Sequence, residues 1–372
     1  MSPASELIAV SVTTRNYLHR TRVLMAGVAR HLPSARRVVC LVDYGATAPS
    51  AEPQDFEIID AATMGVPRFR QLAFALEPVA FCCALKPYLL SYAFERLGAK
   101  QVVYLDNDLR LYRPPDELIA ALADCDLLLT PHLLEPLPSE ANPSEDLILG
   151  YGTFNAGLIG ATDTADTLAF LRWWGQRMAT PRNLGVHPGY DQKWLEYAPS
   201  FLPRLGVLRH AGYNVASWNL ASRPPTIAGD GLRIAGAPLT VFHFSSFDEA
   251  QPAQLIRSGL TCNYSPAPVI VALAEDYGRA LEAAGAAACM DLGYGFSAFT
   301  DGRPISIEQR SYFRDRMWEL AAPDADPFDP AFSLGGVAIG SLSRPSRQRL
   351  FSTKRWRGAV AALARRLRQP RR

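Results

Sequence analysis

The sequence predicts an α/β protein with a mostly parallel central sheet flanked by helices. Short apolar, β-branched runs alternate with helical patterns through the first part of the chain, and short links join them, which is typical of a doubly wound sheet. The 372 residues are 48% hydrophobic and 20% charged, the composition of an ordinary globular protein with enough chain for a large core.

The expected elements of the first part alternate between strand and helix. Strands are predicted at residues 7–12, 37–42 and 56–60, and a helix is predicted at 20–31. Residues 69–97 are expected to be mostly helical, with interruptions at Pro78 and Pro87, because proline lacks the N–H that a helix interior needs. A further strand at 102–105 ends at Asp106.

The second part of the chain carries fewer and shorter elements. Strands are expected at 126–130, 154–160, 207–208 and 241–242, and helices at 164–178 and 191–197. Residues 131–142, rich in Pro, Glu and Ser, are typical of a surface loop. The sequence shows no internal repeat and no linker before about residue 300, and it turns Pro-, Gly- and Ser-rich beyond 323.

The net charge of +2 is unevenly distributed. Residues 352–372 carry eight Lys or Arg and no acid, which leaves 30 basic residues against 36 acidic ones elsewhere. Nucleic acid is not expected as a partner, because nucleic-acid-binding domains usually carry a basic face on the folded body. The cationic tail places Trp356, Val360, Leu363 and Leu367 on one helical stripe. This pattern fits either an interfacial helix attracted to anionic lipid or a disordered solubilising tail.

The cysteines and the N-terminus favour a cytoplasmic protein. None of the six cysteines has metal-ligand spacing, and Cys40 and Cys125 lie in apolar runs, where a reduced thiol is expected. The first apolar run has no basic residue before it, so no signal peptide is expected. No apolar stretch approaches the length that a bilayer span needs.

The segment 102–112 carries the strongest chemical signal, because its apolar run ends in Asp106-Asn107-Asp108. In an extended chain, residues i and i+2 point the same way, roughly 6.6 Å apart, so Asp106 and Asp108 would face one side. There they could hold a hard divalent cation with open positions for phosphate, at the edge where open α/β sheets bind ligands. The alternative is that the acids cap the following turn or helix.

Four more motifs accompany this pair in a fixed order along the chain. They are Ser11-Val12-Thr13-Thr14-Arg15-Asn16-Tyr17, Phe154-Asn155-Ala156-Gly157, Tyr190-Asp191-Gln192 and Val241-Phe242-His243-Phe244. Together, over roughly residues 6–250, they resemble the GT-A-fold glycosyltransferases, most closely glycosyltransferase family 8 and its bacterial relatives. The resemblance implies a GT-A, Rossmann-like nucleotide-diphospho-sugar transferase fold.

The resemblance also implies a nucleotide-sugar donor, usually UDP-linked, and a Mn²⁺ or Mg²⁺ ion that bridges its two phosphates. Asp106, Asp108 and His243 match the metal ligands of the family. The chemistry agrees, because a diphosphate leaving group needs a cation and because an imidazole beside two carboxylates suits manganese. The alternative for His243, which lies between two phenylalanines, is a hydrogen-bonded core histidine.

Residues beside the transferred sugar are implied by two of the motifs. Asn155, Asp191 and Gln192 match the catalytic positions, and Ala156 and Gly157 match donor-binding ones. Gly157 would allow a close approach of the backbone to substrate, and Asp191 could accept hydrogen bonds from sugar hydroxyls. A helix N-cap is the alternative role for Asp191. Family 8 enzymes retain the anomeric configuration, so the resemblance implies retention.

The remaining donor-binding assignments follow from the resemblance too. Tyr17 matches an aromatic ring that stacks on uracil, with a packing role as the alternative. The other matched donor positions are Ser11, Thr13, Thr14, Lys86, Asp106 and Asn107. Lys86 directly precedes Pro87, which favours the first position of a helix, and a cation there opposes the helix dipole. A phosphate or sugar oxygen would explain it, and a solvated surface lysine is the alternative.

The sequence departs from the family after His243. Family 8 enzymes commonly continue with a Gly and then Lys-Pro-Trp, whereas this chain has Phe244-Ser245-Ser246-Phe247-Asp248 with no lysine close behind. Arg257 or Lys193 could substitute for the missing cation. The segment 210–219, rich in amide and aromatic residues, could line the sugar or acceptor site or form a structural turn. The segment 294–303 receives no role.

The expected organisation is a GT-A glycosyltransferase domain at residues 1–300, a C-terminal extension packed on or near the active site at 301–350, and a basic amphipathic tail at 351–372. The expected activity is transfer of a hexosyl-type sugar to an unknown saccharide, lipid-linked or protein acceptor, in envelope glycan or glycoconjugate synthesis. The expected location is the cytoplasm, with peripheral contact to the inner membrane through the tail.

Two other functions fit the same fold. A sugar nucleotidyltransferase usually needs a Gly-rich, basic loop after its first strand, and residues 13–19 contain no glycine. A non-catalytic protein of this fold that binds a sugar or a nucleotide is the second alternative.

Overall fold

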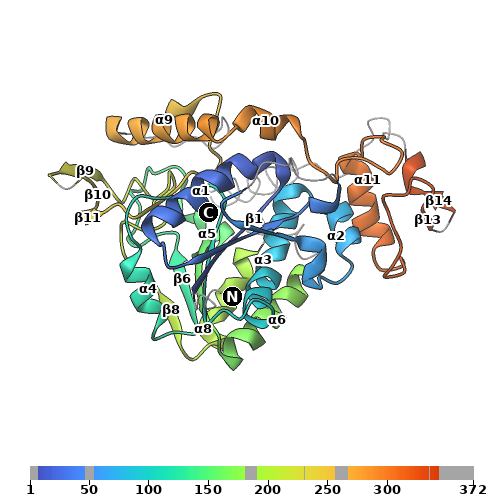
Figure 1. The fold of residues 1–372 in the computed structure, drawn as a ribbon, viewed down its shortest axis with the longest axis horizontal. Coiled ribbons are helices and arrows are strands. Elements are labelled where there is room, and N and C mark those ends of the chain that lie inside the picture. Colours follow the sequence, from blue (N-terminus) through green and yellow to red (C-terminus); the bar gives the residue numbers. More distant parts are fainter. Residues whose placement is uncertain are drawn as a thin grey trace, which may run out of the picture.

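A seven-stranded, mostly parallel sheet lies at the centre of the protein (Figure 1). The computed structural model describes residues 7–46, 54–180, 191–229, 231–255, 267–334 and 336–342. The strands of the sheet stand in the order β3-β2-β1-β4-β7-β6-β8. Strand β7 runs antiparallel to both of its neighbours, and the other adjacent pairs are parallel. The predicted α/β class with a mostly parallel sheet is confirmed.

The strands are mostly short. The main sheet contains Leu7–Thr13 (β1), Arg36–Leu41 (β2), Glu57–Asp60 (β3), Gln101–Leu105 (β4), Leu127–Pro131 (β6), Phe154–Thr162 (β7) and Leu205–Val207 (β8). Smaller antiparallel groups are formed by Leu109–Leu111 (β5) with Val241–His243 (β12), by Pro225–Ala228 (β9), Gly231–Ile234 (β10) and Ala237–Pro238 (β11), and by Ser333–Leu334 (β13) with Val337–Ala338 (β14).

Helices cover both faces of the sheet. The α-helices are Leu18–His31 (α1), Phe69–Ala75 (α2), Pro78–Glu95 (α3), Asp116–Leu122 (α4), Glu145–Tyr151 (α5), Ala165–Met178 (α6), Ala198–Phe201 (α8), Pro268–Ala283 (α9), Ala286–Asp291 (α10) and Ile307–Tyr312 (α11). Short helices of other types lie at Arg15–Tyr17 (η1), Tyr44–Ala46 (η2), Ala61–Met64 (η3), Gln192–Tyr197 (η4), Pro252–Gln254 (η5), Phe313–Met317 (η6) and Ile339–Ser341 (η7).

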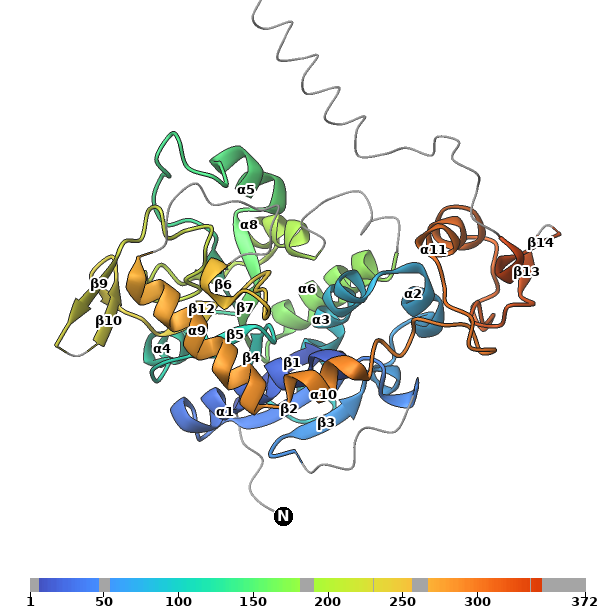
Figure 2. The same cartoon turned by 90° about the horizontal axis from the view of Figure 1, so that it is seen from above.

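Alternate residues of β1 face opposite sides of the sheet, as the period of two requires. Ile8, Val10 and Val12 belong to the buried cluster that contains α2, α3 and α6, whereas Ala9 belongs to the cluster that contains α1. Figure 2 shows α1 and α3 on opposite sides of β1. A run of apolar residues buried on both faces is what a central strand of an α/β sheet requires.

Helix α3 differs from its prediction at one of its two prolines. Pro78 takes the first position of the helix, where its missing N–H costs nothing. Pro87 lies inside the helix and does not end it, so the predicted interruption there is wrong. Leu85 and Leu89, on either side of Pro87, are fully buried against the sheet cluster. The packing of these side chains holds α3 together across the missing hydrogen bond.

Helix α9 has no counterpart among the predicted elements, and it fixes the position of β12. The rings of Phe244 and Tyr277 stack with their centroids 3.9 Å apart, and Phe242 lies in the same buried cluster. Strand β12 is thereby held between β5 on one side and α9 on the other. This places the side chain of His243 in the interior.

Residues 296–342 form the end of the molecule that carries α11, β13 and β14 (Figure 2). The side chains of Phe296, Phe313 and Phe328 belong to the same buried cluster as α2 and α3. The buried guanidinium of Arg310 donates to the carbonyls of Ala73, Phe74, Leu76 and Phe296. It thereby satisfies carbonyls that the last turn of α2 leaves without partners.

The remaining large-scale expectations concern the termini. No helix in the described ranges combines the length and apolar character that crossing a bilayer demands. The predicted tail at 351–372 lies outside the described residues, and the division of the chain at residue 300 stays a prediction.

We expect Arg310→Met to lower the free energy of unfolding by roughly 2–4 kcal/mol, because several buried carbonyls would lose a charged donor. Urea denaturation followed by tryptophan fluorescence measures this change. The matched control is Arg316→Met, which removes an exposed arginine from the neighbouring helical turn. Equal stability of the two variants would contradict the anchoring role of Arg310.

Candidate functional site

The acidic pair Asp106 and Asp108 lies in a tight turn at the end of β4. The N–H of Leu109 donates to the carbonyl of Asp106 over 3.0 Å and closes this turn, after which β5 pairs with β12. The prediction that both carboxylates extend from one face of a strand is therefore wrong. The chain leaves the main sheet here because β5 finds its partner in β12. The turn nevertheless directs the two carboxylates to one place.

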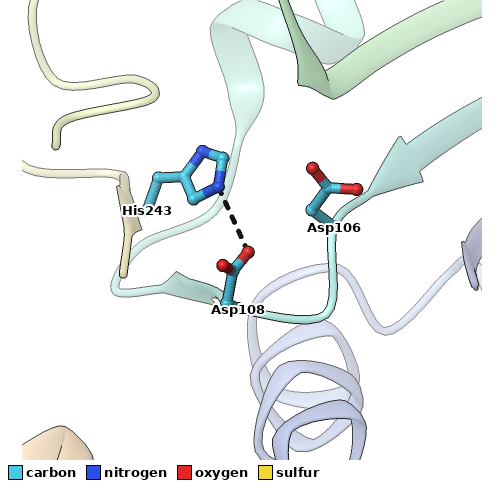
Figure 3. Close-up of side chains that lie close together, drawn as sticks. All are labelled: Asp106, Asp108 and His243. Atoms are coloured by element: carbon cyan, nitrogen blue, oxygen red, sulfur yellow. Dashed lines mark ion pairs between the residues drawn. The ribbon is translucent and has the colours of Figure 1, made fainter. Parts of the chain in front are cut away.

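The imidazole of His243 reaches this place from β12 (Figure 3). Its Nε2 lies 3.1 Å from Oδ1 of Asp108. One ligand atom from each of Asp106, Asp108 and His243 can be chosen so that all lie within 4.8 Å of one another. His243, more than 130 residues further along the chain, is thus brought to the other two predicted metal ligands, Asp106 and Asp108.

Asn214 determines which nitrogen of His243 faces the acids. Its side-chain oxygen lies 2.9 Å from Nδ1 of His243, so Nδ1 carries the proton that it donates. This leaves Nε2 directed at Asp108. His243 is therefore both a buried, hydrogen-bonded histidine and a residue of the acidic cluster, so the two alternatives for it are compatible. A hydrogen bond of this kind commonly orients a metal-binding imidazole.

The charges of His243 and Asp108 stabilise each other and offset the cost of burial. Burial alone would lower the pKa of His243, but the carboxylate of Asp108 outweighs it and leaves that pKa above its ordinary value. Burial likewise opposes the charge of Asp108, and the imidazole lowers the pKa of its carboxyl below the ordinary value. The arrangement therefore favours a negative charge on Asp108.

Lys86 is buried and connects the acidic turn to the start of η4. Its Nζ lies 3.0 Å from Asp106 and 2.9 Å from Asp191, and it donates to the carbonyl of Ala156 over 3.1 Å. Burial disfavours its charge, yet Asp106 and Asp191 raise its pKa well above the ordinary value. A solvated surface lysine is excluded. Lys86 does not lie at a helix N-terminus either, because Pro87 lies inside α3 rather than at its start.

Asp191 directs its carboxylate at Lys86 and does not cap the helix that follows it. The structure gives Asp191 the N-cap position of η4, but its side chain accepts no hydrogen bond from that helix. Burial raises the pKa of the Asp191 carboxyl, and Lys86 counteracts part of this rise. The N-cap alternative is therefore wrong.

Asn155 and Gln192 are joined in a network that begins at His132. The amide nitrogen of Asn155 donates to Nε2 of His132 over 3.2 Å and lies 3.4 Å from the side-chain oxygen of Gln192. The same oxygen of Gln192 accepts from the N–H of Ala156 over 3.3 Å. The three predicted catalytic residues Asn155, Asp191 and Gln192 thus border one region, at the start of β7 and of η4.

Gly157 is required by close contacts with the acidic cluster. A Cβ at this position would lie 2.6 Å from Cε1 of His243, 2.8 Å from Oδ1 of Asn155 and 2.9 Å from Oδ2 of Asp106. These separations are shorter than van der Waals contact, so only glycine leaves the three side chains where they are. The predicted close approach at Gly157 exists, with neighbouring side chains as its partners in this structure.

A cavity of about 530 Å³ opens beside the acidic turn. Six predicted donor-binding or metal residues line it, namely Thr14, Tyr17, Lys86, Asp106, Asn107 and Asp108. Ser11 and Thr13 are fully buried and do not line it. Thr13 instead accepts a hydrogen bond from the amide of Asn107 over 3.1 Å, which ties the turn to the end of β1. A role of Ser11 at the donor stays a prediction.

Of the two residues suggested as replacements for the missing lysine, one can be placed relative to the cavity. Lys193 donates to the carbonyl of Leu149 and does not line the cavity, and Arg257 lies outside the described residues, as does Tyr190. Arg20, which carried no prediction, lines the cavity together with Ser245 and Ser246.

Several residues of the site were missed because their partners come from distant segments. His132 follows β6 in what was predicted to be a loop, and Asn214 lies in the segment 210–219 that had two alternative roles. The side-chain amide of Asn219 supports Asn214, because it donates to the backbone carbonyl of Asn214 over 3.0 Å. The abundance of amides in this segment was the available signal.

The comparisons with known proteins give distant similarity. No family model matches the sequence. Over 180 residues the chain is 26% identical to the uncharacterized protein YfnD of Bacillus subtilis (strain 168), in an alignment covering 45% of this chain and 53% of that protein. The chain thus spans about half the length of the curated relative it matches. This similarity does not place the chain in a family.

The backbone trace of this chain is similar to those of two glycosyltransferases of known structure. One, involved in glycosylation of the major capsid of PBCV-1, has a TM-score of 0.39 and 13% identity, over 64% of this chain and 93% of that chain. The other, galactosyltransferase LgtC in complex with donor and acceptor sugar analogues, has a TM-score of 0.44 and 15% identity, over 74% of this chain and 95% of that one.

We expect the stability of the protein to depend on His132 between pH 4 and pH 6.5. Burial lowers the pKa of folded His132 from 6.5 to about 4. In this window the unfolded state binds more protons, so the free energy of unfolding falls as the pH falls, by roughly 3 kcal/mol at most. Urea denaturation from pH 4 to pH 7 measures the free energy of unfolding. This free energy should change less steeply with pH in His132→Gln than in the wild type. Identical slopes would contradict a neutral His132.

Gly157→Ala should displace the side chains around it and lower the free energy of unfolding by roughly 1–3 kcal/mol. The one-bond correlation of the His243 ring, recorded by NMR in ¹³C-histidine-labelled protein, should shift. Gly150→Ala is the control, because a Cβ at Gly150 meets no atom within 4 Å. An unshifted His243 resonance in the Gly157 variant would contradict the close packing.

Proposed function

We propose that this protein is a metal-dependent glycosyltransferase of the GT-A type, which transfers a sugar from a nucleotide diphosphate to an acceptor. The observation that carries the proposal is the convergence of Asp106, Asp108 and His243 within 4.8 Å, beside a cavity of about 530 Å³. A buried cation, Lys86, and a candidate base platform, Tyr17, line the same cavity. This combination suits a ligand that carries both phosphates and an aromatic ring.

The side chains of Asp106, Asp108 and His243 offer ligand atoms that fit a divalent cation such as Mn²⁺ or Mg²⁺. Two carboxylates supply hard oxygen ligands, and a neutral imidazole favours manganese over magnesium. The hydrogen bond from His243 to Asn214 leaves Nε2 directed at Asp108, the nitrogen that a metal ion would need. A bound cation would supply the positive charge that stabilises a diphosphate leaving group.

Asp191, Gln192 and Asn155 would surround the reacting sugar. The carboxylate of Asp191 accepts hydrogen bonds and is kept in place by Lys86 at 2.9 Å. The side-chain oxygen of Gln192 is fixed by the N–H of Ala156 and by Asn155, so this amide has a defined orientation. We infer retention of the anomeric configuration, since the family that the sequence resembles is retaining and these three residues include no free carboxylate acting as a base.

The nucleoside would lie between the start of α1 and the acidic turn. Tyr17 is partly exposed at the cavity, and Thr14 lines the same wall, which supports stacking on a base such as uracil. We propose UDP as the nucleotide, a hexosyl group as the sugar, and a saccharide, lipid-linked or protein acceptor of envelope glycans. Action in the cytoplasm at the membrane surface, through the tail at 351–372, belongs to the same proposal.

We expect Asp108→Ala and His243→Ala each to reduce sugar transfer and donor hydrolysis by at least about 100-fold, because each removes a ligand of the cation. Release of free nucleotide from a panel of nucleotide sugars with MnCl₂ measures the activity, and calorimetric titration measures manganese binding. The matched control is Asp166→Ala, which removes an exposed acid from α6.

Two outcomes would decide against this proposal. Full activity of either variant would remove the metal role. Binding of UDP and manganese to the wild type with no nucleotide release from any donor would instead favour a non-catalytic protein of the same fold.

A further inference from the structure

Arg20 lies in the first turn of α1, where a positive charge is unfavourable. The N-terminus of a helix carries a partial positive charge, and no acidic residue occupies the first turn of α1. Arg20 is nevertheless only 8% exposed. The helix itself does not explain a buried arginine at this position, so the explanation must lie in what the guanidinium contacts.

Glu249 holds this guanidinium in one orientation. Nε and Nη2 of Arg20 donate to Oε1 of Glu249 over 3.0 and 2.8 Å, and Nη2 also donates to the carbonyl of Phe247 over 3.1 Å. The buried ring of His19 lies 3.0 Å from the same carboxylate oxygen. The carbon at the centre of the guanidinium lies 5.1 Å from the centroid of the Tyr17 ring. Nη1 has no hydrogen-bond partner within the ranges that the structure describes.

The turn that follows β12 lies next to Arg20. The N–H of Phe247 donates to the carbonyl of Phe244 over 3.1 Å, and Ser246 has a φ of 59°, a left-handed conformation that is uncommon for serine. Ser245 and Ser246 line the cavity together with Arg20. Among the described residues, neither serine has a hydrogen-bond partner for its N–H or its hydroxyl. Unpaired N–H groups in such turns commonly bind anions.

This turn is also fixed relative to the acidic pair. The N–H of Phe244 donates to the carbonyl of Asp108 over 2.9 Å. Arg20 and the two serines line the same cavity as Asp106 and Asp108, and so does Lys86, which pairs with Asp106. A ligand in the cavity would therefore meet two cations beside the acidic turn.

Charge also favours a cation at this end of the cavity. Asp106 and Asp108 line the cavity with Lys86 and Arg20, whereas Asp191 and Glu249 pair with these two cations from outside the lining. With neutral histidines the formal sum of the six groups is −2, and a divalent ion would bring it to zero. Arg20 neutralises Glu249, whose unpaired negative charge would otherwise oppose the binding of a diphosphate.

We propose that Arg20, positioned by Glu249, binds the diphosphate of the donor together with the turn at Ser245 and Ser246. Residues 244–250, directly after His243, contain no lysine or arginine, so Arg20 supplies the positive charge beside this turn. The inference rests on the proposed function and adds a residue to it. Arg20 supplies the charge, and Glu249 supplies its orientation.

The test compares the binding of three probes in the presence of MnCl₂ by isothermal titration calorimetry. Inorganic pyrophosphate reports on the diphosphate site without a base, UDP carries both parts, and uridine carries the base alone. Arg20→Gln should weaken the binding of pyrophosphate and UDP by about 10- to 100-fold and leave the binding of uridine and manganese unchanged. Arg20→Lys keeps the positive charge but lacks the planar guanidinium with its paired N–H donors. It should therefore recover part of the lost affinity for pyrophosphate.

Glu249→Gln serves as the positioning variant, and Arg30→Gln as the matched control, because Arg30 is exposed at the other end of α1. Glu249→Gln should weaken the binding of pyrophosphate less than Arg20→Gln does. Arg30→Gln should bind all three probes with the affinity of the wild type. Thermal denaturation of each variant verifies that it is folded.

Equal binding of pyrophosphate by wild type and Arg20→Gln would overturn the inference and leave the proposed function intact. An equal loss of uridine and pyrophosphate would also overturn it, because it would indicate that Arg20 only holds α1 in place. If the folded wild type binds neither pyrophosphate nor UDP, GDP or ADP with manganese, the proposed function itself fails, and this inference falls with it.

Discussion

The ammonium of Lys86 is the contact on which the arrangement of the site depends. It joins the turn after β4, the beginning of η4 and the first residues of β7, through Asp106, Asp191 and the carbonyl of Ala156. The buried charges of Lys86 and Asp191 would be costly without partners, and the partly buried Asp106 would repel Asp191 if no cation lay between them. Each charge is therefore tolerated only because the others are present. This mutual dependence keeps three segments, separated by up to about a hundred residues, at one point of the structure.

Around this contact, the site is assembled from two kinds of structure. The main sheet supplies the rigid part, namely the end of β4 and the start of β7, and both are buried between helices on the two faces. The pair β5 and β12 supplies the second part, because it leaves the sheet and carries His243 back toward Asp108. Helix α9 fixes this pair from outside through the stacked rings of Tyr277 and Phe244. Residues remote from the chemistry therefore determine where the imidazole lies.

The features that depend on the local pattern of residues could be predicted from the sequence. The strands β1, β2, β4 and β7 are apolar, β-branched runs. The grouping of Asp106, Asp108 and His243 was implied by the resemblance to GT-A glycosyltransferases, and the three side chains do lie together. The turn at 106–108, the uninterrupted α3 and the helix α9 could not be predicted, because packing between distant segments decides them. The same holds for the orientation of Arg20, whose guanidinium donates to Glu249, more than two hundred residues away. Long-range pairs of this kind leave no trace in the local spacing of residues.

The direction of β7 has a consequence for where the site can change. Because β7 is antiparallel to β4 and β6, its first residues, Asn155 to Gly157, stand at the edge where the parallel strands end. Asn155 pairs with Thr130 of β6, and the carbonyl of Gly157 accepts from the N–H of Asp106, so this segment is tied to both neighbouring strands. The start of α1 and the turn after β12 lie outside the main sheet. Under the proposed function, substitutions that alter base recognition should therefore be tolerated better than substitutions beside the sugar, which would disturb the middle of the sheet.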